Sequence, residues 1–186
     1  MQRLSSEWKA IHHELRNFFF EMREIILRAI LATALTLASL TASAQQTVNI
    51  EESVKQIVEE MDNIKGFDCL VLTHGLQLKI VKEIFKQKFG KEFMKDVTSI
   101  LLVNYSKASE EDRKTFRGKI EEIAAQLQEF RLSEQHTKEA EYTRGYATVI
   151  EKSLISNLMV ITENDGKALF FYMSGTLNTS KMELDI

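Results

Sequence analysis

The chain has 186 residues, of which 44% are hydrophobic and 27% charged, and its formal net charge is −3. This length and composition fit one globular domain, with or without an appendage, and favour neither a disordered nor a fibrous protein. Residues 45–186 alone hold 19 Lys and Arg against 23 Asp and Glu, a net charge of −4 that argues against nucleic acid as a partner. The single cysteine, Cys69, excludes an intrachain disulfide.

The amino-terminal region has the pattern of an export signal. A basic segment begins at Met22 and is followed by an apolar run over residues 29–40. Ala42 and Ala44 then supply the small side chains that signal peptidase requires at the −3 and −1 positions before Gln45. This order predicts cleavage after Ala44.

A retained membrane anchor is the alternative interpretation of the same segment. A spanning helix needs about 20 apolar residues, and Arg28 ends the apolar run well short of that length. We therefore expect residues 22–44 to be a cleaved signal peptide, with no stable membrane span afterwards. Residues 1–21 lie upstream of a complete signal and are interpreted as a mis-called amino-terminal extension that begins at too early a start codon. The alternative is a real, unusually long extension that is also removed. The mature chain, 45–186, is expected to be a single domain in the periplasm or secreted.

Helices and strands alternate in the first part of the mature chain. Apolar residues recur at helical spacing in three segments, whereas two short apolar segments are rich in β-formers. The predicted helices cover 50–64, 76–89 and 109–127, and the predicted strands cover 67–72 and 97–105. Asn49 with Glu52, and Ser109 with Asp112, are spaced as helix-capping pairs. The predicted order is α-β-α-β-α.

Four segments rich in β-formers follow and predict a meander. They are 130–135, 142–150, 155–162 and 167–174. The last two are joined by Glu163-Asn164-Asp165-Gly166, whose Asn, Asp and Gly tolerate the positive φ of a tight hairpin. We therefore expect an α+β fold, a two-layer sandwich in which a mostly antiparallel sheet carries the helices on one face.

Cys69 and His74 are the residues from which a small thiol- or histidine-dependent enzyme could be built. Five residues along an extended strand separate them by roughly 16 Å, and a free cysteine in mid-strand is typical of a protein core. His136 could join His74 only through the fold. The motifs HExxH, CxxC, GxxxxGK[ST], GxGxxG and GxSxG do not occur. We therefore assign no catalytic, cofactor-binding or metal-binding residue, and no cofactor.

Two features are candidates for a binding surface. Tyr142, Arg144 and Tyr146 alternate along one predicted strand and point one way, which suits recognition of a protein or glycan. The alternative is an ordinary amphipathic outer face. A predicted helix and its neighbourhood also carry several lysines, Lys79, Lys82, Lys86, Lys88, Lys91 and Lys95. Acidic residues interleaved with them favour a solvated face over a site for an acidic partner.

The order of elements, the export signal and the closing strands LISNLMVIT (154–162) and LFFYMSGTL (169–177) resemble the DUF 4252 family of exported bacterial envelope proteins. The resemblance covers most of residues 50–182. It implies a Gram-negative envelope location and a compact α+β sandwich, and no catalytic residue follows from it. The leading hypothesis is a non-catalytic exported envelope protein that binds another envelope protein or a periplasmic ligand. A small thiol- or histidine-dependent enzyme and an envelope regulatory or sensor component are the alternatives.

Overall fold

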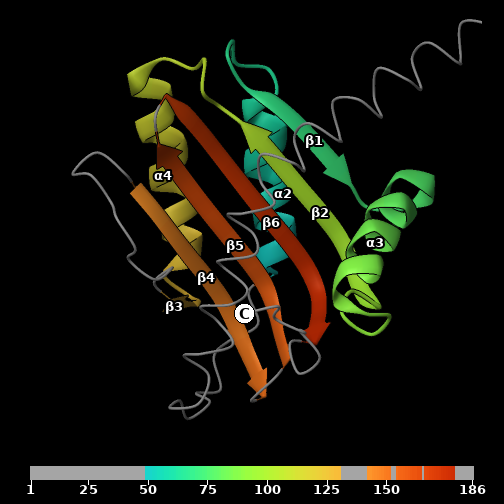
Figure 1. Ribbon diagram of the computed structural model, residues 1–186. Helices are drawn as coiled ribbons and strands as arrows, with labels where there is room; N and C mark the ends of the chain where they lie inside the picture. The colour runs from blue at the N-terminus through green and yellow to red at the C-terminus, as the bar shows by residue number, and fades with distance from the viewer. Residues whose placement is uncertain (1–48, 131–141, 152–153, 165, 179–186) are drawn as a thin grey trace, which may run out of the picture.

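The computed structural model describes residues 49–130, 142–151, 154–164 and 166–178 (Figure 1). The elements in chain order are α2 (Ile50–Met61), β1 (Asp68–Leu72), α3 (Gly75–Phe89), β2 (Asp96–Asn104), α4 (Glu110–Ala124), β3 (Gln128–Phe130), β4 (Tyr142–Glu151), β5 (Leu154–Asn164) and β6 (Lys167–Asn178). The strands form one antiparallel sheet in the order β1-β2-β6-β5-β4-β3. The predicted α+β sandwich and its order of elements are confirmed.

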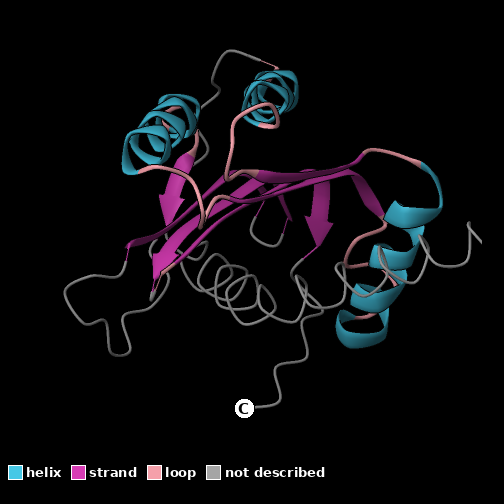
Figure 2. Cartoon of the chain, turned by 90° about the horizontal axis from the view of Figure 1, so that it is seen from above, coloured by secondary structure: helices cyan, strands magenta, loops and turns pink. Residues whose placement is uncertain are grey.

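Helices α2 and α4 lie side by side over one face of the sheet, which we call the α2/α4 face (Figure 2). Helix α3 departs from the expectation that all helices share that face. Its apolar side chains, including Val81 and Phe85, pack with Leu72 of β1 in a cluster on the opposite side, the α3 face. Leu72 ends β1 pointing to that side, and Gly75, at φ +84°, turns the chain directly into α3. The direction of the chain at the end of β1 therefore places α3 on the side of the sheet opposite α2 and α4.

Local capping fixes where α2 and α4 begin. The Asn49 side chain accepts a hydrogen bond from the Glu52 N–H at 3.3 Å, and Ser109 Oγ accepts one from the Asp112 N–H at 3.2 Å. Both helices end three residues before their predicted ends. There the chain tightens into three-residue turns, in which the N–H groups of residues 64 and 127 donate to the carbonyls of residues 61 and 124.

The hairpin between β5 and β6 is confirmed. Asn164 pairs with Lys167, so only two residues form the turn, and Gly166 has φ +79° as the sequence requires. Of the predicted strand 130–135, the structure describes only Phe130, as the end of β3. The remainder and the tail after Asn178 lie outside the described residues.

Aromatic side chains join α4 to the sheet on the α2/α4 face. The ring of Phe116 contacts those of Phe67, Tyr105 and Phe170 edge to face, with centroids 5.0–5.6 Å apart. At the hairpin end, Glu163 accepts hydrogen bonds from the Tyr105 hydroxyl and, at 2.8 Å, from the Arg117 guanidinium of α4. These contacts fix α4, and α2 beside it, over the centre of the sheet.

Candidate functional site

Cys69 lies on the edge strand β1, half-buried against the apolar cluster of the α2/α4 face. Burial, together with the carboxylates of Asp62 and Asp68, raises the pKa of the Cys69 thiol to about 12. The thiol is therefore neutral at physiological pH. A nucleophilic cysteine needs the opposite environment, one that stabilises the thiolate.

His74 does not serve as the base for this thiol in the described structure. It lies beyond the end of β1, immediately before α3, and its Nδ1 is 2.7 Å from the Thr73 hydroxyl. No hydrogen bond between Cys69 and His74 is present among the described residues. His136 lies outside the described ranges.

The prediction that Tyr146 lies on an exposed face of β4 is wrong. This side chain is only 6% exposed and belongs to the apolar cluster of the α2/α4 face. Alternation along the strand correctly separates the two faces, but the side that carries Tyr146 is the one the helices cover. Arg144 lies at the rim, 46% exposed, with its guanidinium 3.7 Å from the Glu121 carboxylate of α4. For Tyr142 the structure describes only the backbone, within β4.

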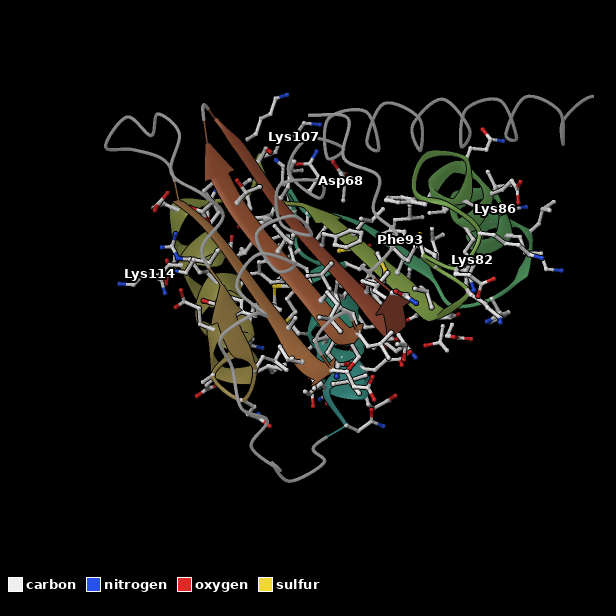
Figure 3. All side chains as sticks on the ribbon, turned by 60° about the horizontal axis from the view of Figure 1, so that its bottom comes forward. Asp68, Lys82, Lys86, Phe93, Lys107 and Lys114 are labelled. Atoms are coloured by element: carbon white, nitrogen blue, oxygen red, sulfur yellow. The ribbon has the colours of Figure 1, made fainter. Side chains whose placement is uncertain are left out.

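The lysines around α3 make local contacts. Lys82 Nζ donates to the carbonyl oxygens of Lys95 and Val97, each at 2.8 Å, and so ties α3 to the start of β2 (Figure 3). Lys86 pairs with Glu83 at 2.8 Å, three residues away on the same helix. These contacts fit the interpretation of a solvated helix surface with a structural role for Lys82.

A line of backbone irregularities crosses the sheet beneath the start of α2. The register shifts between residues 97 and 99 where β2 pairs β6, between 156 and 158 where β5 pairs β6, and between 146 and 148 where β4 pairs β5. Asn157 lies in this line at φ +49°, and Gly175 lies there at φ +87°. Bulges concentrate near functional sites because they re-aim side chains, so this line is the candidate site.

Gly175 lets β6 approach β2 closely at this line. A Cβ atom there would lie 2.1 Å from the Asp96 carbonyl oxygen and 2.8 Å from the Thr98 nitrogen. The close approach brings the Ser174 hydroxyl within 2.8 Å of Ser99 Oγ and 2.6 Å of Thr98 Oγ1. Three hydroxyl groups from two strands thus meet at the point where the register shifts.

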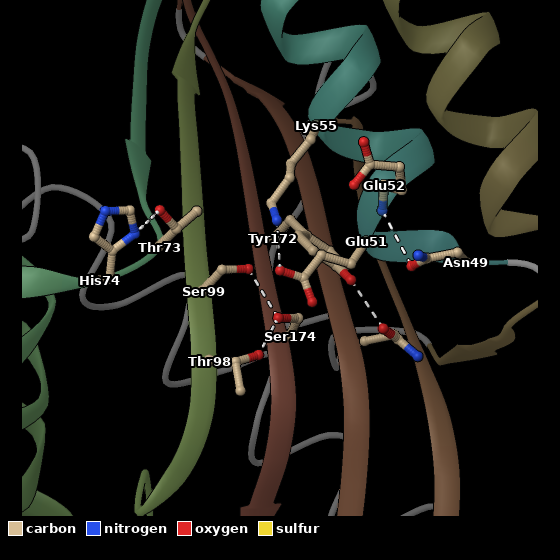
Figure 4. A network of polar contacts seen from close by, with 11 residues as sticks. Asn49, Glu51, Glu52, Lys55, Thr73, His74, Thr98, Ser99, Tyr172 and Ser174 are labelled. Carbon is tan, nitrogen blue, oxygen red and sulfur yellow. Dashed lines mark hydrogen bonds and ion pairs between the residues drawn. The ribbon is translucent and has the colours of Figure 1, made fainter.

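The first turn of α2 places Glu51 directly over these hydroxyls (Figure 4). Its carboxylate accepts a hydrogen bond from Lys55 Nζ at 2.9 Å and further bonds from Ser174 and Ser99. Burial alone would raise the pKa of Glu51, but the hydrogen bonds from Lys55, Ser174 and Ser99 outweigh it and hold the pKa below its ordinary value. Glu51 is therefore an ionised acceptor at neutral pH.

Tyr172 and Asn157 complete the site. The Tyr172 hydroxyl donates to Asn157 Oδ1 at 2.8 Å, and Asn157 Nδ2 donates to Thr148 Oγ1 at 3.2 Å. Burial and the nearby charge of Glu51 raise the pKa of Tyr172 well above its ordinary value, so the phenol stays a neutral donor. We call the whole set the polar network: Glu51, Lys55, Thr98, Ser99, Thr148, Asn157, Tyr172 and Ser174.

The polar network is arranged to hold the elements together rather than to react. Ser99 is 0% and Ser174 2% exposed, so a solute cannot reach either hydroxyl. Glu51 and Lys55 are its partly exposed charged members, with side chains 29% and 25% exposed. The members of the network come from α2, β2, β4, β5 and β6. A buried polar cluster whose hydrogen bonds are satisfied fixes the relative positions of the elements that carry it.

Sequence reasoning missed the polar network because its members come from distant parts of the chain. Two signals for it were present. Asn157 interrupts the apolar strand 155–162, and Gly175 interrupts the last strand, and each residue type inside a strand indicates a bulge or a close backbone approach.

No cluster of three or more His, Cys, Asp or Glu side chains suited to a metal ion occurs in the described part of the chain. Within the same ranges, no helix has both the length and the apolar character needed to cross a membrane. Comparisons with protein-family models, curated proteins and solved structures find no match. The resemblance to the DUF 4252 family therefore stays a prediction.

Proposed function

We propose that this protein is a non-catalytic, exported protein of the Gram-negative envelope that acts as a binding module. The signal-peptide pattern ending at Ala44 supports export. The observation that carries the non-catalytic part is the state of Cys69, the candidate nucleophile. Burial and neighbouring carboxylates keep its thiol neutral by raising the thiol pKa.

An enzyme built on Cys69 would need a thiolate and an approach path for substrate. The surroundings of Cys69 supply two nearby carboxylates, which disfavour the thiolate. In a binding module the same residues only stabilise the fold, and recognition is left to the surface.

The alkylation rate of Cys69 tests the non-catalytic proposal. The processed protein, purified in native form, is treated with iodoacetamide at neutral pH, and labelling is followed by intact mass. We expect labelling at least about a hundredfold slower than that of the same protein in denaturant, because the raised thiol pKa leaves almost no thiolate. A Cys69→Ala variant should show no labelling. Native labelling as fast as, or faster than, that of the denatured protein contradicts the proposal and favours the thiol enzyme.

A further inference from the structure

The α3 face of the sheet is an apolar surface that crosses four strands. Its side chains come from β2, β6, β5 and β4, and none of them is charged: Ile100, Leu102, Leu169, Phe171, Met173, Leu158, Val160 and Ala147. Each is at most 3% exposed in the full chain. This face is therefore covered in the full chain. What covers it in the mature protein determines the oligomeric state of that protein.

The described helices cover only one end of the α3 face. Helices α2 and α4 lie on the opposite side of the sheet, and α3 lies at the β1 end (Figure 2). The side chains on β5 and β4, Leu158, Val160 and Ala147, are at the other end of the strand order. Among the described helices, none lies over these side chains on the α3 face (Figure 2).

The predicted cleavage removes the most apolar part of the chain outside the described elements. Residues 29–40 form a run dominated by Ala, Leu and Ile. After cleavage at Ala44, the segments outside the described ranges are 45–48, 131–141, 152–153, 165 and 179–186. None of these segments has two consecutive apolar residues. The apolar residues of these segments are few and lie among polar and charged ones, so the mature chain offers far less apolar surface than residues 29–40 with which to shield the face.

We infer that in the mature protein a second copy of the chain covers this face, giving a two-fold symmetric dimer in which sheet packs on sheet. The inference rests on the export and cleavage in the proposed function. Two sheets stacked face to face bury their facing side chains in one layer about 10 Å thick. A two-fold interface requires a surface that complements itself, and an uncharged face of large apolar side chains meets that requirement.

The size of the face fits a dimer better than a small ligand. Four strands about 4.8 Å apart and about seven residues long, at about 3.3 Å per residue, present roughly 450 Å² in projection. A patch of this size is among the largest that typical monomers expose, about 300–600 Å², and such patches are often functional. Because side-chain relief adds accessible area, two such faces together approach the lower limit of specific interfaces, about 1,200 Å². Small-molecule sites are concave and carry a few polar groups, whereas this face is an uncharged sheet surface.

Sedimentation of the processed protein tests the inference. The full chain is expressed in a Gram-negative host, the processed form is purified, and its intact mass is recorded before sedimentation over a wide concentration range. Val160→Asp places a charge at the centre of the α3 face. Val71→Asp is the matched control, because Val71 is 40% exposed on β1 and alternates with Leu72, which points to the α3 face.

We expect the wild-type protein and Val71→Asp to sediment at twice the monomer mass, and Val160→Asp to sediment as a monomer with unchanged circular dichroism. A photo-crosslinking amino acid at position 160 should give a covalent dimer even if Val160→Asp does not fold. A processed wild-type protein that stays monomeric at every concentration overturns the inference, as does a dimer lost in Val71→Asp but kept in Val160→Asp. An intact mass that retains residues before Gln45 contradicts export instead, so the two failures are distinguishable.

Discussion

Gly175→Ala tests the close approach of β6 to β2 on which the polar network depends. Two costs arise at this position. A non-glycine residue at φ +87° costs about 1–2 kcal/mol. The new Cβ atom would also lie 2.1 Å from the Asp96 carbonyl oxygen, so β2 must move. That movement disturbs ladder hydrogen bonds worth about 0.5–1.5 kcal/mol each. We expect a total loss of about 3–4 kcal/mol.

Gly90→Ala is the matched control for this substitution. Gly90 has φ +89°, close to the φ of Gly175, but a Cβ atom there would meet nothing within 4 Å. Its cost should be the conformational part alone, about 1–2 kcal/mol. At a urea m-value of about 2 kcal/mol/M, the unfolding midpoint should fall by about 1.5–2 M for Gly175→Ala and by about 0.5–1 M for the control. Equal shifts for the two variants would refute the proposed close approach.

Three further predictions concern the site and the residues first considered for it. The fold raises the pKa of the Cys69 thiol to about 12, so the unfolded chain loses this proton first as the pH rises. The free energy of unfolding should therefore decline between about pH 9 and 12. Urea titrations at alkaline pH should show this decline in the wild-type protein and not in a Cys69→Ala variant. The pKa of Glu51 is lowered in the fold, so its effect on stability runs the opposite way with pH. Its contribution to the free energy of unfolding is present above the ordinary pKa of 4.5 and is lost as the pH falls through the lower folded value. Glu51→Gln should therefore cost about 1 kcal/mol at neutral pH and little in strong acid. In thermal unfolding, Tyr146→Ala should cost about 3 kcal/mol of stability and Arg144→Ala less than about 1 kcal/mol. Similar small losses for both variants would contradict the burial of Tyr146 and support the original prediction that both side chains are exposed.

The features predicted correctly from the sequence are those that local chemistry decides. The hairpin depends on the two residues of its turn, and Gly166 supplies the positive φ. The helix starts depend on side chains within three residues, as the bonds made by Asn49 and Ser109 show. The antiparallel meander follows because short connections between strands leave no room for a crossover.

Features decided by contacts between distant residues were not predictable in the same way. Alternation along β4 assigns Arg144 and Tyr146 to one face, but only the packing of α2 and α4 decides that this face is covered. Likewise, helical periodicity in residues 75–89 cannot say which side of the sheet α3 takes, because the direction of Leu72 at the end of β1 decides it. The polar network joins Glu51 to Ser174 across more than a hundred residues, and no local pattern reports such a contact.

The intact mass of the protein recovered from fractionated cells of a Gram-negative host tests the central claim, that this chain is an exported envelope domain, most directly. The account predicts a periplasmic or secreted species that begins at Gln45. A species in the cytoplasm or membrane that keeps the residues before Gln45 would contradict it.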